Sequence, residues 1–271
     1  MVNKDTNARQ DKVFEIIVLS YIETAEPVGS RTISRLYEEG LSSASIRNVM
    51  ADLEEEGFIQ QPHTSAGRVP TQKGYRYYVD SLMQREALTK EEEDWILKEL
   101  HKVKTIEGMA EKVSKVISEL THNAALIYIK NLKRLSFLNY LLEDLIQSER
   151  LIDFLEEEPG LFIEGTFRLF EQPEFEDAQK MRLFLQAFDE KCNFLPILLR
   201  DLEEEGVHVH IGRENALDKL VDVSLVVKDC YVGRTAIGGI AVVGPTRMRY
   251  SKIISVVEFV ADTVSEAIER F

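Results

Sequence analysis

Two stretches of the sequence carry side chains that suit contacts with a nucleic acid. Between Ser42 and Asn48 the only charged residue is Arg47. Arginine can pair with guanine or hold a phosphate, and asparagine can pair with adenine through two hydrogen bonds. Between Gln61 and Val79, turn formers and aromatic residues are mixed with three cations, which are Arg68, Lys73 and Arg76. These residue types predict base recognition by the first stretch and phosphate contacts by the second.

Helical spacing of apolar residues predicts the elements that carry the first stretch. A first helix is ended by Pro27-Val28-Gly29, and its apolar positions are Val13, Phe14, Ile17 and Tyr21. Ser30 is expected to cap a short second helix, from Arg31 to Glu39, which ends at Gly40. Ser42 or Ser43 would cap a third helix that ends at Gly57. The apolar positions of that helix repeat at i, i+3, i+4 and i+7, and they are Ile46, Val49, Met50 and Leu53.

The tight Gly-Leu-Ser connection between the second and third helices matches the helix-turn-helix motif, whose second helix lies in the major groove of DNA. The outer face of the third helix is centred on Ala44, Asn48 and Ala51, and its flanks carry Ser45, Arg47 and Asp52. Alanines let the backbone approach the groove floor. The alternative interpretation is that Asn48 and Arg47 are solvated surface residues of a helical bundle.

A β-hairpin is predicted after the third helix. Phe58 to Gln61 has the pattern of a strand, Pro62 to Gly67 that of an exposed turn, and Arg68 to Pro70 that of a returning strand. Such a hairpin is a wing, whose donors can reach phosphates or the minor groove. The candidate donors are His63, Thr64, Ser65 and Arg68.

A fourth helix is expected to begin after Thr71, which would cap it. Lys73 and Arg76 lie near its start, and several tyrosines follow. Aromatic residues at helical spacing are mostly core, so Tyr78 and Val79 are assigned to packing.

Composition favours a soluble, cytoplasmic protein with a local basic surface. The net charge is −14, but residues 1–85 hold 10 Lys and Arg against 12 Asp and Glu, so −12 belongs to the remainder. No apolar run approaches the ~20 residues that span a bilayer, and the N-terminus is too polar for a signal peptide. The only cysteines, Cys192 and Cys230, form no disulfide framework or zinc motif and are expected to be buried.

The remainder of the chain has an α+β pattern. Strands are predicted over residues 207–211, 223–227 and 237–243, where Gly238-Gly239 allows close packing. A helix from Ala178 to Leu199 precedes them. Pro245 to Met248 forms a turn into a last helix, from about Ser251 to Arg270.

Catalytic or metal-binding chemistry has little support, so neither an enzyme activity nor a cofactor is expected. His208 and His210 share one face of a strand, but the sequence offers no third ligand, and exposed strand histidines are the alternative. The runs of consecutive acidic residues spread around helix ends and are interpreted as solvated faces. No phosphate-binding loop, dinucleotide motif or nucleophile elbow is present. Arg247 could hold an anion or form a salt bridge that fixes its turn.

Several motifs resemble the heat-inducible transcription repressor HrcA family. They are PVGSRTIS, SSASIRNVMADLEEEGFIQQPHTSAGRVPTQKGYRYYVDSL and GIAVVGPTRMRYSKIIS, with LFIEG, EQPEF and IGREN between them. The resemblance is nearly continuous from Asp5 to Leu82 and resumes from Gly160 to the C-terminus. It implies an α+β protein with three parts: a winged helix-turn-helix domain over residues 1–85, a helical linker over 86–122, and a GAF-like regulatory and dimerisation domain over 123–271.

The resemblance also implies a function and a set of contacts. Members repress chaperone operons, bind an inverted-repeat operator in double-stranded DNA as a homodimer, and are kept active by the chaperonin GroEL. Transferred by motif, Ser45, Arg47 and Asn48 would read bases, and the wing would contact the flanking DNA. The full set of expected DNA-binding residues is Arg31, Ser43, Ser45, Arg47, Asn48, His63, Thr64, Ser65, Arg68, Lys73 and Arg76.

The chain departs from the family in its centre. Members carry a longer region with an inserted dimerisation segment, whereas here an apolar stretch at Ala124 leads almost directly to LFIEG. Other surfaces would then join the dimer. The candidates are residues 89–121, with apolar residues at near-heptad spacing, and the C-terminal helix. Either could instead pack on its own domain.

The sequence is therefore compatible with two functions from different classes. The first is a sequence-specific repressor of heat-shock operons that loses DNA on heating. The second is a ligand-binding or enzymatic α+β domain whose winged helix serves a protein contact.

Overall fold

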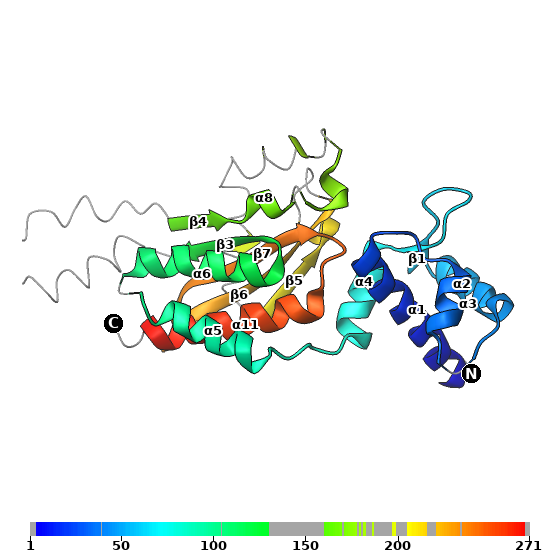
Figure 1. The fold of residues 1–271 in the computed structure, drawn as a ribbon, viewed down its shortest axis with the longest axis horizontal. Helices are drawn as coiled ribbons and strands as arrows, with labels where there is room; N and C mark the ends of the chain where they lie inside the picture. The colour runs from blue at the N-terminus through cyan, green and yellow to red at the C-terminus, as the bar shows by residue number, and fades with distance from the viewer. Residues whose placement is uncertain are drawn as a thin grey trace, which may run out of the picture. The chain divides into compact units, whose positions relative to one another are not determined.

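The computed structural model describes residues 4–38, 40–103, 105–129, 160–169, 171–177, 205–215, 221–233 and 235–268, with residues 179, 181, 182, 186, 197 and 198. The chain forms two compact units (Figure 1). The first, the head unit, comprises Met1–Gln84 and Thr246–Ser251. The second, the sheet unit, comprises Arg85–Pro245 and Lys252–Phe271.

The N-terminal part of the head unit is built from helices and a short hairpin. The helices are α1 (Lys4–Thr24), α2 (Ser30–Leu36), α3 (Ser43–Glu55) and α4 (Gln72–Tyr77), which continues into the π-helical turn η1 (Tyr78–Leu82). The strands β1 (Ile59–Gln60) and β2 (Val69–Pro70) pair antiparallel between α3 and α4. The predicted order of a helix-turn-helix followed by a wing is confirmed.

Serine and threonine caps define two of these helices. The Oγ of Ser42 accepts a hydrogen bond from Ser45 N at 3.1 Å, and the Oγ of Thr71 accepts one from Gly74 N at 3.0 Å. Each satisfies an N–H that has no partner within the helix. Ser42, rather than Ser43, is therefore the cap of α3, and the predicted cap of α4 is confirmed.

The prediction for α2 is wrong at both ends. Gly29, not Ser30, is the N-cap residue, and it has no side chain to form a cap. The helix ends at Leu36 rather than near Gly40, because Tyr37 adopts an extended conformation with ψ 102° while its ring is buried. Burial of an aromatic ring favours this early exit over another helical turn.

Aromatic rings join the wing to the helices of the head unit. The rings of Phe58 and Tyr77 stack with centroids 4.8 Å apart, and Phe14 of α1 packs against both. Tyr75 and Tyr78 are buried, as the core assignment of Tyr78 predicted, whereas Val79 is only half-buried. The Tyr77 hydroxyl donates to Asp11 Oδ1 at 2.7 Å, and burial is the main reason that its pKa rises to about 12.

The sheet unit contains a five-stranded sheet with the order β4-β3-β7-β6-β5. The strands are β3 (Ala124–Ile129), β4 (Gly160–Glu164), β5 (Val207–Ile211), β6 (Val223–Val232) and β7 (Thr235–Pro245), and all neighbours are antiparallel. Three predicted strands are confirmed, and two of them are longer than expected. The close approach expected at Gly238 is also present, because a Cβ there would lie 2.1 Å from the Tyr128 carbonyl oxygen.

Helices cover the sheet and complete its α+β architecture. The longer ones are α5 (Lys90–Leu100), α6 (Ile106–Thr121) and α11 (Tyr250–Ile268), and α6 and α11 run along one face of the sheet (Figure 1). Shorter elements are α8 (Thr166–Leu169), η2 (Pro173–Phe175) and η4 (Gly212–Asn215). The opposite face of the sheet packs on a cluster that includes Leu169, Phe175 and Leu198. The expected α+β fold class is confirmed.

Both stretches considered as dimer surfaces pack on their own unit. Residues 89–121 form α5 and α6, whose buried apolar residues include Ile96, Leu100, Val113 and Ile117. The apolar side of α11 is likewise buried, with Val256, Val257 and Val260 at 0% exposure. Residues 130–159 and most of the helix predicted from Ala178 to Leu199 lie outside the described residues.

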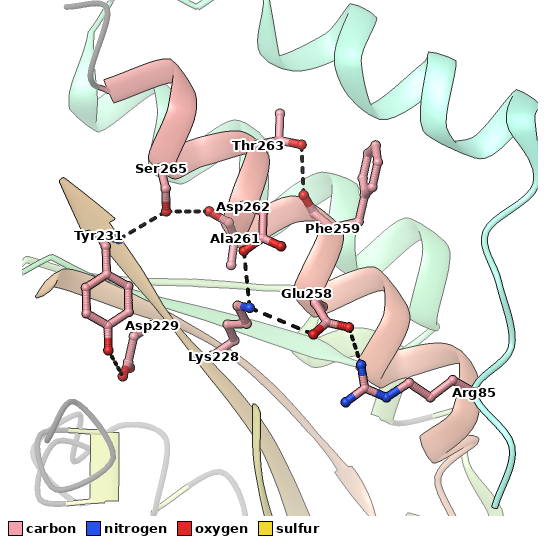
Figure 2. A network of polar contacts seen from close by, with 10 residues as sticks. All are labelled: Arg85, Lys228, Asp229, Tyr231, Glu258, Phe259, Ala261, Asp262, Thr263 and Ser265. Carbon is pink, nitrogen blue, oxygen red and sulfur yellow. Dashed lines mark hydrogen bonds and ion pairs between the residues drawn. The ribbon is translucent and has the colours of Figure 1, made fainter. Parts of the chain in front are cut away.

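Ion pairs attach α11 to the sheet and to the start of the sheet unit (Figure 2). Lys228 of β6 lies 3.1 Å from Asp262 and 3.9 Å from Glu258, both on α11. Glu258 also pairs with Arg85. Main-chain N–H of Tyr231 donates to the Ser265 hydroxyl at 3.0 Å. Helix α11 is therefore held by its polar side as well as by its apolar side.

Two of the acidic runs contain a carboxylate with a defined partner, so the interpretation of them as purely solvated faces is wrong there. Glu92 forms a capping box with Thr89 and also pairs with Lys252. The hydrogen bond from Lys252 is the largest reason that the pKa of Glu92 is lowered. Glu54 of α3 pairs with Arg68 of the wing. Partners distant in sequence decide which carboxylate in each run is engaged.

Candidate nucleic-acid interface

Helix α3 presents the expected base-reading residues to solvent. Ile46 and Leu53 are buried, whereas Ser45, Arg47 and Asn48 are exposed. Ala44 and Ala51 are exposed as well, so small side chains surround the polar ones. The first turn of α3 contains no acidic residue. The face thus exposes a cation, an amide and small side chains, which are types that can contact base edges, and Asp52 is exposed on its flank.

Neighbouring hydroxyls orient two of the three polar side chains. Arg47 Nε donates to Ser30 Oγ at 3.3 Å, which ties α3 to the first residue of α2. The hydroxyls of Ser45 and Ser42 lie 3.0 Å apart. The Asn48 amide makes no hydrogen bond to any residue that the structure describes. The Arg47 side chain is thus held by Ser30, whereas the Asn48 amide has no hydrogen-bond partner among the described residues.

The wing carries its predicted donors at an exposed tip. His63, Thr64 and Ser65 are all exposed. Gln61 braces this turn, because its Nε2 donates at 3.0 Å to the carbonyl oxygens of both Thr64 and Ala66. A braced turn loses less conformational entropy when it contacts a phosphate.

The base of the wing is fixed to the rest of the head unit by the main chain. Val28 and Arg68 exchange two backbone hydrogen bonds of 2.9 Å, so the segment after α1 adds a bridge to the hairpin. A Cβ on Gly67 would lie 2.5 Å from the Val28 carbonyl carbon. Glycine is therefore required for this close approach.

Two of the expected wing contacts also hold the wing against the end of α3. Arg68 places Nη2 2.8 Å from Glu54 Oε2 and is half-buried. Lys73 Nζ donates to the Glu56 carbonyl oxygen at 2.7 Å and lies 4.8 Å from the Phe58 ring centroid. A cation near the C-terminus of a helix is favourable because the last carbonyls lack partners. Both residues therefore have a structural task in addition to any phosphate contact.

The remaining candidates occupy varied positions in the head unit. Arg31 is exposed in the first turn of α2, and Ser43 is half-buried at the start of α3. Arg76 forms an i,i+4 pair with Asp80 at 3.1 Å. The structure thus brings the eleven candidates into one unit. Arg68 and Arg76 pair with acidic residues, whereas the α3 face, the wing tip, Arg31 and Lys73 are exposed and have no acidic partner among the described residues.

Some residues that shape this interface were missed by the sequence analysis. They are Ser30, Glu54 and Gln61, which orient Arg47, Arg68 and the wing tip. The first two act across 17 and 14 residues of sequence. No local pattern could have identified those pairs. Gln61 acts within its own turn, and a glutamine at the start of a wing turn was an available signal.

The histidine pair and Arg247 have no catalytic arrangement around them. His208 and His210 lie half-buried on β5, the last strand of the sheet order. Among the described residues no group of three or more metal-ligating side chains is found. Arg247 donates to a main-chain carbonyl of α1, the oxygen of Ile22.

Comparisons with known proteins point to one kind of protein. Residues 129–254 match the family described as HrcA protein C terminal domain. A heat-inducible transcription repressor HrcA from Syntrophobacter fumaroxidans is 35% identical, with 98% of each chain covered. One from Pelotomaculum thermopropionicum is 34% identical, with 97% of each covered. A crystal structure of a hypothetical protein superposes with a TM-score of 0.72 at 25% identity and covers 100% of this chain and 99% of its own.

The head unit and these relatives define the protein as a transcriptional repressor. Its polar face on α3 lies on the element that winged helix-turn-helix proteins insert into DNA. More particularly, the chain belongs to the heat-inducible transcription repressor HrcA family, as the resemblance of its motifs predicted. Within the residues that the structure covers, no helix is both long and apolar enough to cross a membrane.

The chain is shorter than its relatives. The alignment with the Syntrophobacter protein spans 342 residues, and this chain has 271, so at least 71 aligned positions are occupied only in the relative. The Syntrophobacter protein therefore contains residues that have no counterpart in this chain.

Proposed function

We propose that the protein represses chaperone operons by binding an inverted-repeat operator as a homodimer and releases it on heat stress, in the cytoplasm. One observation supports the proposal that the protein binds DNA. Arg47 and Asn48 stand exposed side by side on α3, opposite its buried apolar side, in a head unit that also has an exposed wing tip. The names of the relatives support the heat-shock part.

A two-fold operator requires a two-fold protein, because each recognition helix reads one half-site. The apolar sides of α6 and α11 are buried against their own sheet, so we place the dimer contact on other surfaces. A chaperonin of the GroEL type is the proposed partner that returns heat-damaged protein to its folded dimer. The acidic excess outside residues 1–85 supports marginal stability through charge repulsion.

The function is tested by selecting duplexes from a randomised library with the purified chain. The expected product is an inverted repeat whose half-site centres lie a whole number of helical turns apart. Fluorescence anisotropy should then show preference for the selected duplex over a scrambled one, by about a thousandfold or more, and affinity should fall steeply with salt. Recovery of no common sequence, with equal binding to both duplexes, would refute sequence-specific repression.

The proposed link between heating and DNA release can be tested with Cys230, whose thiol reports whether the sheet unit is folded. Cys230 is buried on β6, and burial raises the pKa of its thiol to about 12. The thiolate is the reactive form, so the folded protein should resist alkylation at mildly alkaline pH. In a Cys192→Ser variant, Cys230 should become reactive to iodoacetamide at the temperature at which anisotropy reports loss of the selected duplex.

A urea-unfolded sample of the same variant, which should be labelled completely, is the control for reagent activity. The duplex alone must remain double-stranded over the same temperature range. Release of DNA well below the onset of labelling would show that opening of the sheet unit is not the heat signal.

A further inference from the structure

The head unit contains six residues from far along the chain. Thr246–Ser251 belongs to this unit, although β7 before it and most of α11 after it belong to the sheet unit. The segment is therefore held in sequence between two elements of the other unit. Its side chains contact the first and the last helix of the N-terminal part.

The C-terminal end of α1 is where Arg247 acts. Helix α1 ends at Thr24, and Ala25 follows with φ 55°, a left-handed conformation that a residue with a Cβ adopts at some cost. The last carbonyls of a helix lack partners within it and form its negative end. Arg247 Nη1 donates to the carbonyl oxygen of Ile22 at 2.8 Å, which supplies both a hydrogen bond and a positive charge.

Two further residues of the segment fill the apolar interior. Met248 and Tyr250 are at most 2% exposed. The Tyr250 ring lies 6.0 Å from that of Tyr75 on α4, and its hydroxyl donates to the Thr246 carbonyl oxygen at 2.7 Å. The segment is consequently folded on itself and packed on α4, not merely adjacent to it.

Helix α1 connects this segment to the recognition helix. It packs on α3 and on β2, and Val13, Phe14, Ile17 and Val18 are its buried residues, each at 0% exposure. A shift at the end of α1 would therefore alter the support of α3. Support of this kind sets the fraction of molecules whose recognition helix is ready to bind, and the apparent affinity scales with that fraction.

We propose that Arg247 is a positioning residue for DNA binding: by completing the end of α1, the Thr246–Ser251 segment holds the head unit in its binding-competent form. The proposal rests on the proposed DNA-binding function. Because the segment lies between β7 and α11, it stays docked only while the ends of those elements stay folded. An isolated fragment of residues 1–84 would lack this segment and should bind DNA more weakly than the full chain.

The test uses the full chain and the duplex that the wild-type protein selects. Arg247→Ala should bind that duplex about tenfold more weakly, a change of about 1.4 kcal/mol, while Arg247→Lys should stay within about threefold because it retains the cation. Arg249→Ala, an exposed cation two residues away, is the matched control and should bind as the wild type does. Equal affinities for Arg247→Ala and Arg249→Ala would overturn the proposal.

A second measurement needs no substitution. Coupling between sites is reciprocal, so DNA binding should slow hydrogen exchange in residues 246–251 of the wild-type chain as well as in α3. Protection of α3 without protection of residues 246–251 would also overturn the proposal. If the wild type binds no duplex, the proposed function fails, whereas normal wild-type binding with an unaffected Arg247→Ala variant rejects only this inference. Cys230 must remain unlabelled in each variant, as evidence that the sheet unit is folded.

Discussion

The double substitution of Arg47 and Asn48 by alanine should remove the preference for the operator over a scrambled duplex while the protein stays folded. Each two-bond contact to a base contributes about 1–3 kcal/mol of discrimination. Two such contacts in each of two heads therefore amount to about 4 kcal/mol or more in a dimer. Both side chains are exposed, so their removal leaves the core of the head unit unchanged.

The measurement is the ratio of affinities for the selected and the scrambled duplex, together with its salt dependence. Arg35→Ala is the matched control, because it removes an exposed cation in the last turn of α2. Arg35→Ala should lower the affinity for the selected and the scrambled duplex by the same factor. Arg47 could instead contact a phosphate. In that case Arg47→Ala alone should lower the slope of log affinity against log salt concentration by about one per head, and it should leave the preference for the selected duplex unchanged. An unchanged preference in the double variant would show that α3 is not the reading element.

The second large effect is expected at Gly74, where alanine should disrupt the head unit. In the middle of an exposed helix, glycine to alanine normally stabilises by about 1 kcal/mol. Here the added Cβ would lie 2.1 Å from the Phe58 carbonyl oxygen and 3.1 Å from the Phe14 ring. The main chain at Phe58 cannot shift without disturbing its neighbours, so the free energy of unfolding should fall by about 3 kcal/mol or more. The substituted chain should lose DNA binding as a result.

Hydrogen exchange read by mass spectrometry can localise this loss. Peptides from residues 4–82 should exchange faster in Gly74→Ala, and peptides from β6 and β7 should not. Gly29→Ala is the control, since nothing lies within 4 Å of its added Cβ and Gly29 has φ −91°. It should change stability by about 1 kcal/mol at most. Normal exchange in the head of Gly74→Ala would mean that α4 can move away from Phe58.

The sequence by itself determined those features that depend on neighbours within one or two turns. Ile46, Met50 and Leu53 share a side of one helix because their spacing is helical, and that same spacing leaves Arg47 and Asn48 exposed. Thr71 caps α4 for an equally local reason. Alternating and continuous apolar runs located β5, β6 and β7. The family, and with it the class of function, followed from motifs that are continuous in sequence.

The tertiary structure alone decided the pairings between residues that meet only after the chain has returned on itself. Ser30 was assigned to a cap and instead accepts a hydrogen bond from Arg47. Glu54 and Glu92 look like their acidic neighbours in the sequence, yet Arg68 and Lys252 engage them. Arg247 reaches a carbonyl 225 residues away. Such contacts depend on where the packing of apolar surfaces places two distant backbones, and hydrophobic burial is non-directional, so no local spacing encodes them.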